Sequence, residues 1–135
     1  VSMFLGSILS GSNEIQNFIS LNIGENFPFW IMIILLPFVV WFFALLGVHP
    51  IITSAPILSL FGPLLSVWEA AFLMQAHLIG WCAGTASSFT SLSVLTTAEN
   101  FKISIKKLIF GPNLIATGCL TLFGSILLIL LNYFL

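Results

Sequence analysis

Two long stretches without a charged side chain restrict the fold of this chain more than any other feature. They cover residues 27–47 and 108–135. Each provides about 20 or more residues, the length a helix needs to cross the roughly 30 Å hydrocarbon layer of a bilayer. Trp30 and Tyr133 lie near their ends, where amphipathic rings favour the headgroup level. Both stretches therefore predict membrane-spanning helices, and Pro37 predicts a kink in the first.

The composition of the whole chain agrees with a membrane location. Of 135 residues, 59% are hydrophobic and 5% are charged, whereas soluble domains have about 25% charged residues. A domain of this size exposes about a third of its unfolded surface after folding, so a buried core cannot hide so many apolar side chains. We expect an all-α, polytopic helical membrane protein that has the lipid bilayer as its first partner.

Two further spans are predicted between the first pair, over 48–66 and 67–97. Three prolines in the first of these make a straight helix unfavourable, so a kinked span or a re-entrant hairpin is expected there. The second span is predicted to break near 84–88, where Gly84 precedes a run rich in Ser and Thr. Residues 1–20 resemble the end of a preceding broken helix. All of these segments are assigned to a single transmembrane domain.

The lysines set the expected orientation of the chain. All three lie in one short connection, as Lys102, Lys106 and Lys107. Because short basic loops stay in the cytoplasm, this loop is predicted to be cytoplasmic and the last helix to run outward. The expected location is the inner membrane of a bacterial or archaeal cell.

The run after Gly84 is the strongest candidate for a binding site. Eight of the thirteen residues in 85–97 are Ser or Thr. Hydroxyls and freed backbone groups at a broken membrane helix bind small cations or oxyanions, and such breaks are tolerated where they line a cavity. The alternative is helix packing along the ridge formed by Gly80, Gly84 and Ser88. The predicted substrate or ion ligands are Thr85, Ser87, Ser88, Thr90 and Ser91.

Three ionisable residues are candidates for a polar relay or gate. Glu69 and His77 precede the hydroxyl run, and an ionisable group at membrane depth is costly unless it is paired. His77 could pair with Glu69 or transfer protons; the alternatives are an interfacial position for Glu69 and a hydrogen bond to a neighbouring helix for His77. His49 precedes Pro50 at the end of the first span, where a hinge or hairpin entry is the alternative to a ligand role.

The sequence does not predict an enzyme, a resident cofactor or a metal site. It contains no Asp and no nucleophile elbow around its serines. The two histidines are far apart in the sequence without a third ligand. Cys82 and Cys119 lie in apolar stretches and are expected to be small buried hydrophobic residues. The net charge of −1 argues against a nucleic-acid partner, because phosphate binding requires clustered Lys or Arg.

These segments together resemble a known family. An apolar span ending in Gly47-Val48-His49-Pro50, a proline-rich segment, and then Gly80-Trp81-Cys82-Ala83-Gly84-Thr85-Ala86-Ser87-Ser88 are similar to the C-terminal half of permeases in the ion transporter superfamily. That group is similar to the divalent-anion/sodium symporters and to the membrane subunits of periplasmic-binding-protein-dependent carriers. The resemblance implies inverted repeats, each with a re-entrant hairpin and a broken helix that meet near the bilayer midplane. The Ser-Asn-Thr triplet of the symporters' anion site is missing, which argues against a dicarboxylate substrate.

The expected function is therefore secondary active transport. The chain would be one inverted-repeat half of a carrier that moves a small solute, such as an organic or inorganic anion, with sodium or protons as the coupling ion. Because the sequence begins at Val1 and has the length of one repeat, it is expected to require a missing N-terminal half or a partner chain, and a homo-oligomer is one way to supply it. The alternative is a non-transporting membrane subunit that anchors or assembles a larger complex.

Overall fold

The computed structural model describes residues 11–14, 17, 21 and 28–134, and every element bounded in that part of the chain is a helix. The expectation for residues 1–20 therefore lies mostly outside the described residues. The elements are α3 (Phe29–Leu45), α4 (Pro50–Phe61), η2 (Gly62–Leu64), α5 (Val67–Ser87), α6 (Leu92–Phe101), α7 (Ile105–Leu108), η3 (Ile109–Asn113) and α8 (Leu114–Phe134).

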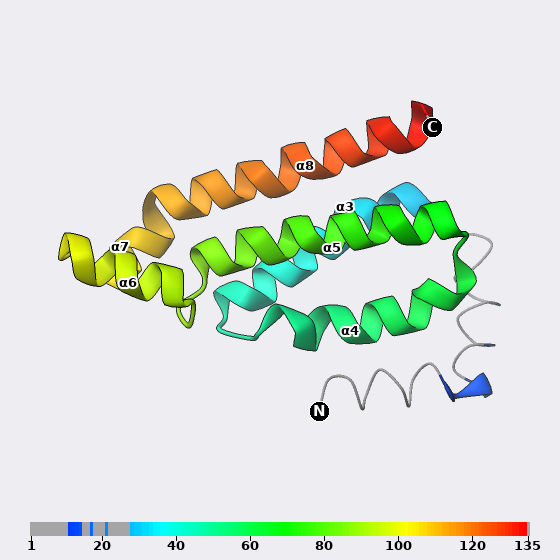
Figure 1. The fold of residues 1–135 in the computed structure, drawn as a ribbon, viewed down its shortest axis with the longest axis horizontal. Coiled ribbons are helices and arrows are strands. Elements are labelled where there is room, and N and C mark those ends of the chain that lie inside the picture. The colour runs from blue at the N-terminus through cyan, green and yellow to red at the C-terminus, as the bar shows by residue number, and fades with distance from the viewer. Residues whose placement is uncertain (1–10, 15–16, 18–20, 22–27, 135) are drawn as a thin grey trace.

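Four helices run lengthwise beside one another, and the short helices α6 and α7 form one end of the molecule (Figure 1). Helices α3 and α5 run in the same direction and pack closely on each other. Helix α4 lies against both and runs the opposite way, as α8 does on another side of the pair. The start of α4, the end of α5 and the start of α8 consequently lie at the same end of the bundle.

Small residues allow α3 and α5 to approach closely. A Cβ atom added to Gly80 would lie 2.7 Å from the Pro37 carbonyl oxygen, and one added to Gly84 would lie 2.7 Å from Ala44 Cβ. The ridge predicted from Gly80 and Gly84 is thus in contact with α3. Around it, the buried core is built mainly from aliphatic side chains, including Ile33, Leu36, Val40, Leu73 and Ala76.

The proline-rich segment forms one helix followed by a 3₁₀ turn. Pro50 occupies the first turn of α4, where its missing N–H removes no hydrogen bond. Pro63 lies in η2, beyond the end of the helix. Gly47 has a φ of 86°, a conformation that favours glycine, and allows the chain to reverse between α3 and α4. Helix α3 itself continues through Pro37.

The hydroxyl-rich segment contains a break, at residues 88–91. Helix α5 continues through Gly84 to Ser87, and α6 begins at Leu92. The break therefore begins one helical turn after Gly84. Gly84 itself stays within the helix, where it packs against Ala44 of α3. Further along, Gly111 has non-helical torsion angles inside η3, so the last long helix begins at Leu114.

Two helical stretches in the described part of the chain are long and apolar enough to cross a membrane, namely Val67–Phe101 and Ile105–Phe134. This assignment rests on length and composition. Only 33% and 22% of their apolar windows are buried, whereas a core helix of a soluble protein is buried all round. Helix α3 and the segment Pro50–Leu64 are apolar but shorter.

Candidate functional site: a hydroxyl-lined hollow

A polar hollow lies where α5 ends. It has a volume of about 300 Å³ and is formed by the last turn of α5, the break at 88–91, the first turn of α6 and the start of α4. The lining residues are His49, Pro50, Gly84, Thr85, Ser88, Thr90, Ser91, Leu92 and Ser93. The structure therefore brings together four of the five hydroxyls predicted as ligands, and places His49 beside them.

Hydrogen bonds hold the hydroxyls of the hollow in place. Ser88 Oγ lies 3.0 Å from Thr90 Oγ1 and also accepts from the Thr90 backbone N–H at 3.3 Å. Ser91 Oγ lies 2.7 Å from Ser93 Oγ, and Ser93 donates to the Thr85 carbonyl at 3.2 Å. Each hydroxyl oxygen has two lone pairs and one proton, so these bonds leave acceptor capacity for a bound ligand.

The start of α6 adds backbone donors to the same hollow. Ser91 is the N-cap residue of α6, but its hydroxyl makes no capping bond and pairs with Ser93 instead. The first N–H groups of a helix have no partner within the helix, and Leu92 and Ser93 both line the hollow. Within the part of the chain that the structure describes, no carboxylate or lysine lines it. The hollow thus combines hydroxyls, uncapped N–H groups and one imidazole.

Ser87, the fifth predicted ligand, lies outside the hollow. It is fully buried between helices, where Trp41 Nε1 donates to Ser87 Oγ at 3.0 Å and to Thr117 Oγ1 at 3.1 Å. Ser87 in turn donates to the Ala83 carbonyl at 2.7 Å. One indole N–H thereby connects α3, α5 and α8, so Ser87 has a packing role and is not available to a solute.

The two histidines flank one tryptophan. The His49 and His77 rings contact Trp81 edge to face, with centroid distances of 5.4 Å and 5.3 Å. His49 caps α4, because its Nδ1 accepts from the Ile51 N–H at 3.4 Å. His77 is only 6% exposed, and its Nδ1 has no hydrogen-bond partner among the described residues. The predicted hydrogen bond from His77 to a neighbouring helix is therefore not made at Nδ1.

Glu69 lies at the opposite end of α5. Its carboxylate accepts from the Ser66 N–H at 2.9 Å, while Ser66 Oγ accepts from the Glu69 N–H at 3.3 Å. These two bonds form a capping box at the start of the helix. Thr85 lies 16 residues further along, about 24 Å at 1.5 Å per residue. Glu69 therefore caps α5 and is not paired with His77.

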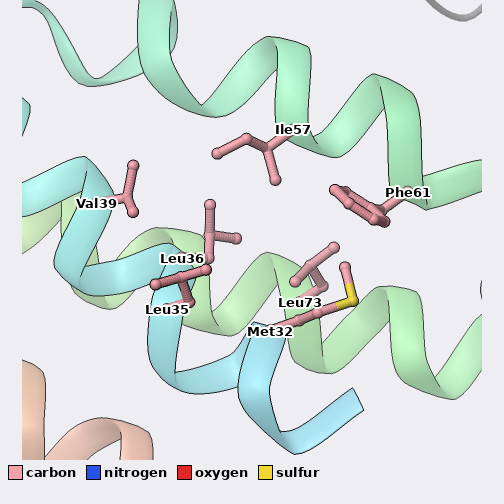
Figure 2. Close-up of a pocket in the computed structure, with 7 residues that line it drawn as sticks. All are labelled: Met32, Leu35, Leu36, Val39, Ile57, Phe61 and Leu73. Carbon is pink, nitrogen blue, oxygen red and sulfur yellow. The ribbon is translucent and has the colours of Figure 1, made fainter. Parts of the chain in front are cut away.

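A second cavity is entirely apolar in character. It encloses about 150 Å³ between α3, α4 and α5, and Figure 2 shows the side chains that surround it. The lining residues are Met32, Leu35, Leu36, Val39, Ile57, Phe61 and Leu73. With no polar side chain to replace a hydration shell, this cavity does not suit an ion.

Three residues matter here that the sequence did not single out as site residues. Trp41 connects three helices, and Ser93 borders the hollow as well as a neighbouring cavity that includes Thr97. Asn113 donates from Nδ2 to the Ala86 carbonyl at 2.8 Å, which supplies a partner for the last turn of α5. Asn113 ends η3 directly before α8, and its contact with α5 depends on tertiary packing.

Metal-binding residues do not gather in the described part of the chain. No group of three or more His, Cys, Asp or Glu side chains lies close enough there to hold a metal ion. Cys82 and Cys119 are free thiols, and both are exposed on the helix surface. This corrects the expectation that they are buried, since each lies on a face that no neighbouring helix covers.

The chain matches no protein-family model, no curated protein sequence and no solved structure. The resemblance to the ion transporter superfamily therefore stays a prediction that rests on the residues quoted for it.

Proposed function

We propose that this chain is a membrane-spanning part of a secondary carrier for a small anion, and that the hydroxyl-lined hollow collects the anion at one membrane surface. The observation that carries the proposal is the meeting of five hydroxyl residues, His49 and the uncapped start of α6 around one hollow. A missing N-terminal half, a partner chain or a second copy would complete the transport path.

The helix lengths support a placement across the bilayer. Trp30, Trp68 and Tyr133 are exposed near the start of α3, the start of α5 and the end of α8, which lie at the same end of the bundle (Figure 1). Exposed Trp and Tyr rings favour the membrane interface. We therefore infer that these three rings mark one headgroup level.

The other headgroup level follows by counting residues from these rings. His49 lies 19 residues after Trp30, Ser88 lies 20 after Trp68, and Asn113 lies 20 before Tyr133. At 1.5 Å per helical residue the second and third lengths are about 30 Å, the thickness of the hydrocarbon layer, whereas α3 ends at Leu45 and gives about 22 Å from Trp30. The hollow would thus open at the surface on the lysine side. This depth differs from the midplane site implied by the resemblance, and suits an entrance where a solute is first bound.

The chemistry of the hollow favours an anion over a cation. The N–H groups at the start of α6 donate to oxyanions, and the dipole of α6 is positive at this end. The hydroxyl protons of Thr85 and Ser93 are already used in bonds to backbone carbonyls, so the donors for an anion are mainly the N–H groups of α6. None of the described carboxylates lines the hollow, so a cation would find only neutral oxygens among these residues. The three lysines, on the same side of the bundle, would raise the local concentration of anions. Sodium or protons remain the proposed coupling ions.

Cysteine labelling in proteoliposomes tests this proposal. In a background with Cys82→Ser and Cys119→Ser, Thr90→Cys and Ser91→Cys should react with a charged, membrane-impermeant thiosulfonate reagent. Phosphate or sulfate at millimolar concentration should slow the reaction. Ser87→Cys is the matched control and should stay unlabelled, because Ser87 is fully buried.

Two results would count against the carrier. Failure of the charged reagent to reach either cysteine would mean that the hollow is dry. Labelling at equal rates with and without both anions would remove the argument for an anion site. Whatever the labelling shows, uptake of radiolabelled phosphate or sulfate by the full-length protein would measure transport directly.

A non-transporting assembly subunit is the second candidate. It is favoured by the hydrogen bonds of Trp41 with Ser87 and Thr117, which use buried polar groups to hold three helices together. It is also favoured by the pairing of the hollow's hydroxyls with one another. An assembly subunit predicts that labelling at residues 90 and 91 appears only after removal of a partner.

A further inference from the structure

The apolar cavity between α3, α4 and α5 has a buried floor and a partly exposed rim (Figure 2). On the floor, Leu36 and Leu73 are only 2% and 1% exposed. The rim opens at the surface between α3 and α4, and Leu35 there is 52% exposed. The rim residues are Leu35, Val39, Ile57 and Phe61.

The cavity separates the second half of α4 from the rest of the bundle. The buried residues of α4 are Pro50 and Ser54, which both lie in its first half. In the second half, Ile57 and Phe61 point across the cavity toward the floor (Figure 2). Side chains around such a gap make fewer dispersion contacts than side chains in a close-packed core. An apolar occupant would therefore bring α4 into continuous contact with α3 and α5.

The lining defines the chemistry of that occupant. Every lining side chain in the described part of the chain is a hydrocarbon or a thioether, so water would find no polar partner and the cavity is expected to stay dry. The volume of about 150 Å³ equals that of an engineered cavity, lined by Leu, Ile and Phe, that binds benzene. The cavity is thus of a size to take a short stretch of hydrocarbon.

The depth of the cavity follows from the same count of residues that places the helices in the bilayer. Met32 and Val39 lie 2 and 9 residues after Trp30 on α3. Leu73 lies 5 residues after Trp68 on α5. At 1.5 Å per helical residue, the lining lies about 3–14 Å below the headgroup level marked by these two tryptophans. That range falls within one half of the roughly 30 Å hydrocarbon layer, so the rim faces acyl chains.

We propose that the cavity binds one acyl chain of a membrane lipid, which enters through the rim and fills the space between α4 and the pair formed by α3 and α5. This inference rests on the membrane placement given under the proposed function, and it adds a lipid site that shares no lining residue with the hollow. An acyl chain is the occupant because the lining is apolar throughout and the rim lies at the depth of the hydrocarbon.

Photolabelling with a lipid tests this proposal. The full chain is reconstituted into phosphatidylcholine bilayers that contain a phosphatidylcholine with a diazirine in the middle of one acyl chain, and the labelled residues are mapped by mass spectrometry. Leu36 and Leu73 should be labelled, although both are too buried to touch a lipid that stays outside the rim.

Two substitutions of the same kind in α4 provide a matched comparison. Ile57→Phe enlarges a side chain that lines the cavity, and should reduce the labelling of Leu36 and Leu73 severalfold. Ile52→Phe makes the same change at a position that is 50% exposed and outside the lining, and should leave this labelling unchanged. Equal labelling of the floor in both variants would overturn the site.

Labelling of Ile126, exposed in the middle of α8, separates this proposal from the membrane placement on which it rests. If Ile126 is labelled but Leu36 and Leu73 are not, no acyl chain enters the cavity; the proposal is overturned and the carrier stands. If Ile126 is also unlabelled, the membrane placement and the lipid site fall together. This comparison uses the unsubstituted chain, so it decides the matter even where Ile57→Phe fails to fold.

Discussion

At the scale of single residues, the hydroxyl run shows how neighbours in sequence acquire different roles. Adjacent residues on a helix point about 100° apart. Ser87 continues the buried stripe of Ala76, Gly80 and Ala83 on α5, whereas Ser88 ends the helix and lines the hollow. The polarity of these side chains is the same, so their roles follow from the position of α3 and α8 around α5.

The contact of Gly80 with α3 predicts a large effect of a single methyl group. In Gly80→Ala the new Cβ would lie 2.7 Å from the Pro37 carbonyl oxygen and 3.0 Å from Val40 Cβ. The Pro37 carbonyl belongs to the backbone and cannot rotate away as a flexible side chain can, so α3 must shift. We expect a loss of about 1–3 kcal/mol in the free energy of unfolding, measured by denaturant titration in micelles. Gly62→Ala, where nothing lies within 4 Å, is the control; equal stability of both variants would contradict the packing.

The indole of Trp41 provides a second prediction at this scale. Trp41→Phe removes the donor shared by Ser87 and Thr117, while both hydroxyls keep their own bonds to backbone carbonyls. We expect a loss of about 1–2 kcal/mol in the free energy of unfolding, the size typical of one or two hydrogen bonds. Trp81→Phe removes an indole that contacts two histidine rings but donates no hydrogen bond in the described structure, and should cost less. A larger loss in Trp81→Phe would show that ring volume, not the N–H, holds the helices.

At the scale of elements, the start of α5 assigns Glu69 a local role. Ser66→Ala removes the cap and should lower the free energy of unfolding by about 1 kcal/mol. Glu69→Gln keeps an acceptor for the Ser66 N–H and should be milder. In the carrier proposal neither variant should change the labelling of Thr90→Cys by the charged reagent, since Glu69 is about 24 Å along the helix. Loss of labelling in Glu69→Gln would instead support a relay.

The sequence was sufficient to predict the helical class and most of the element positions, because long apolar runs and prolines act locally. Residues 27–47 contain α3, and 108–135 contain α8. The position of the break was predicted less well. Glycine is a weak helix former, but the helix continues through Gly84 because the lack of a side chain there leaves room for Ala44 of α3. Likewise, no local pattern could show that Trp41 would take Ser87 out of the candidate site.

At the scale of the whole molecule, the proposed placement implies that the two ends of α5 lie on opposite sides of the membrane. Ser66 precedes α5 at the end marked by Trp30, Trp68 and Tyr133, and Lys102 follows α6 at the other end of the molecule. The apolar faces of α5 and α8 would then contact lipid, and the segment with the three lysines would remain on the cytoplasmic side.

Sidedness of labelling tests this placement. In the background without native cysteines, Lys102→Cys should react with an impermeant maleimide only in inside-out vesicles, and Ser66→Cys only in intact cells. Both positions are exposed, so a lack of reaction from one side reports the membrane and not burial. Reaction of both cysteines from the same side would mean that α5 does not cross. The 20-residue spacing from Trp68 to Ser88 sets the depth of the hollow only if α5 crosses the membrane, so reaction from the same side would also remove the entrance on the lysine side. Reaction of the two cysteines from opposite sides would instead show from which face of the membrane the anion enters.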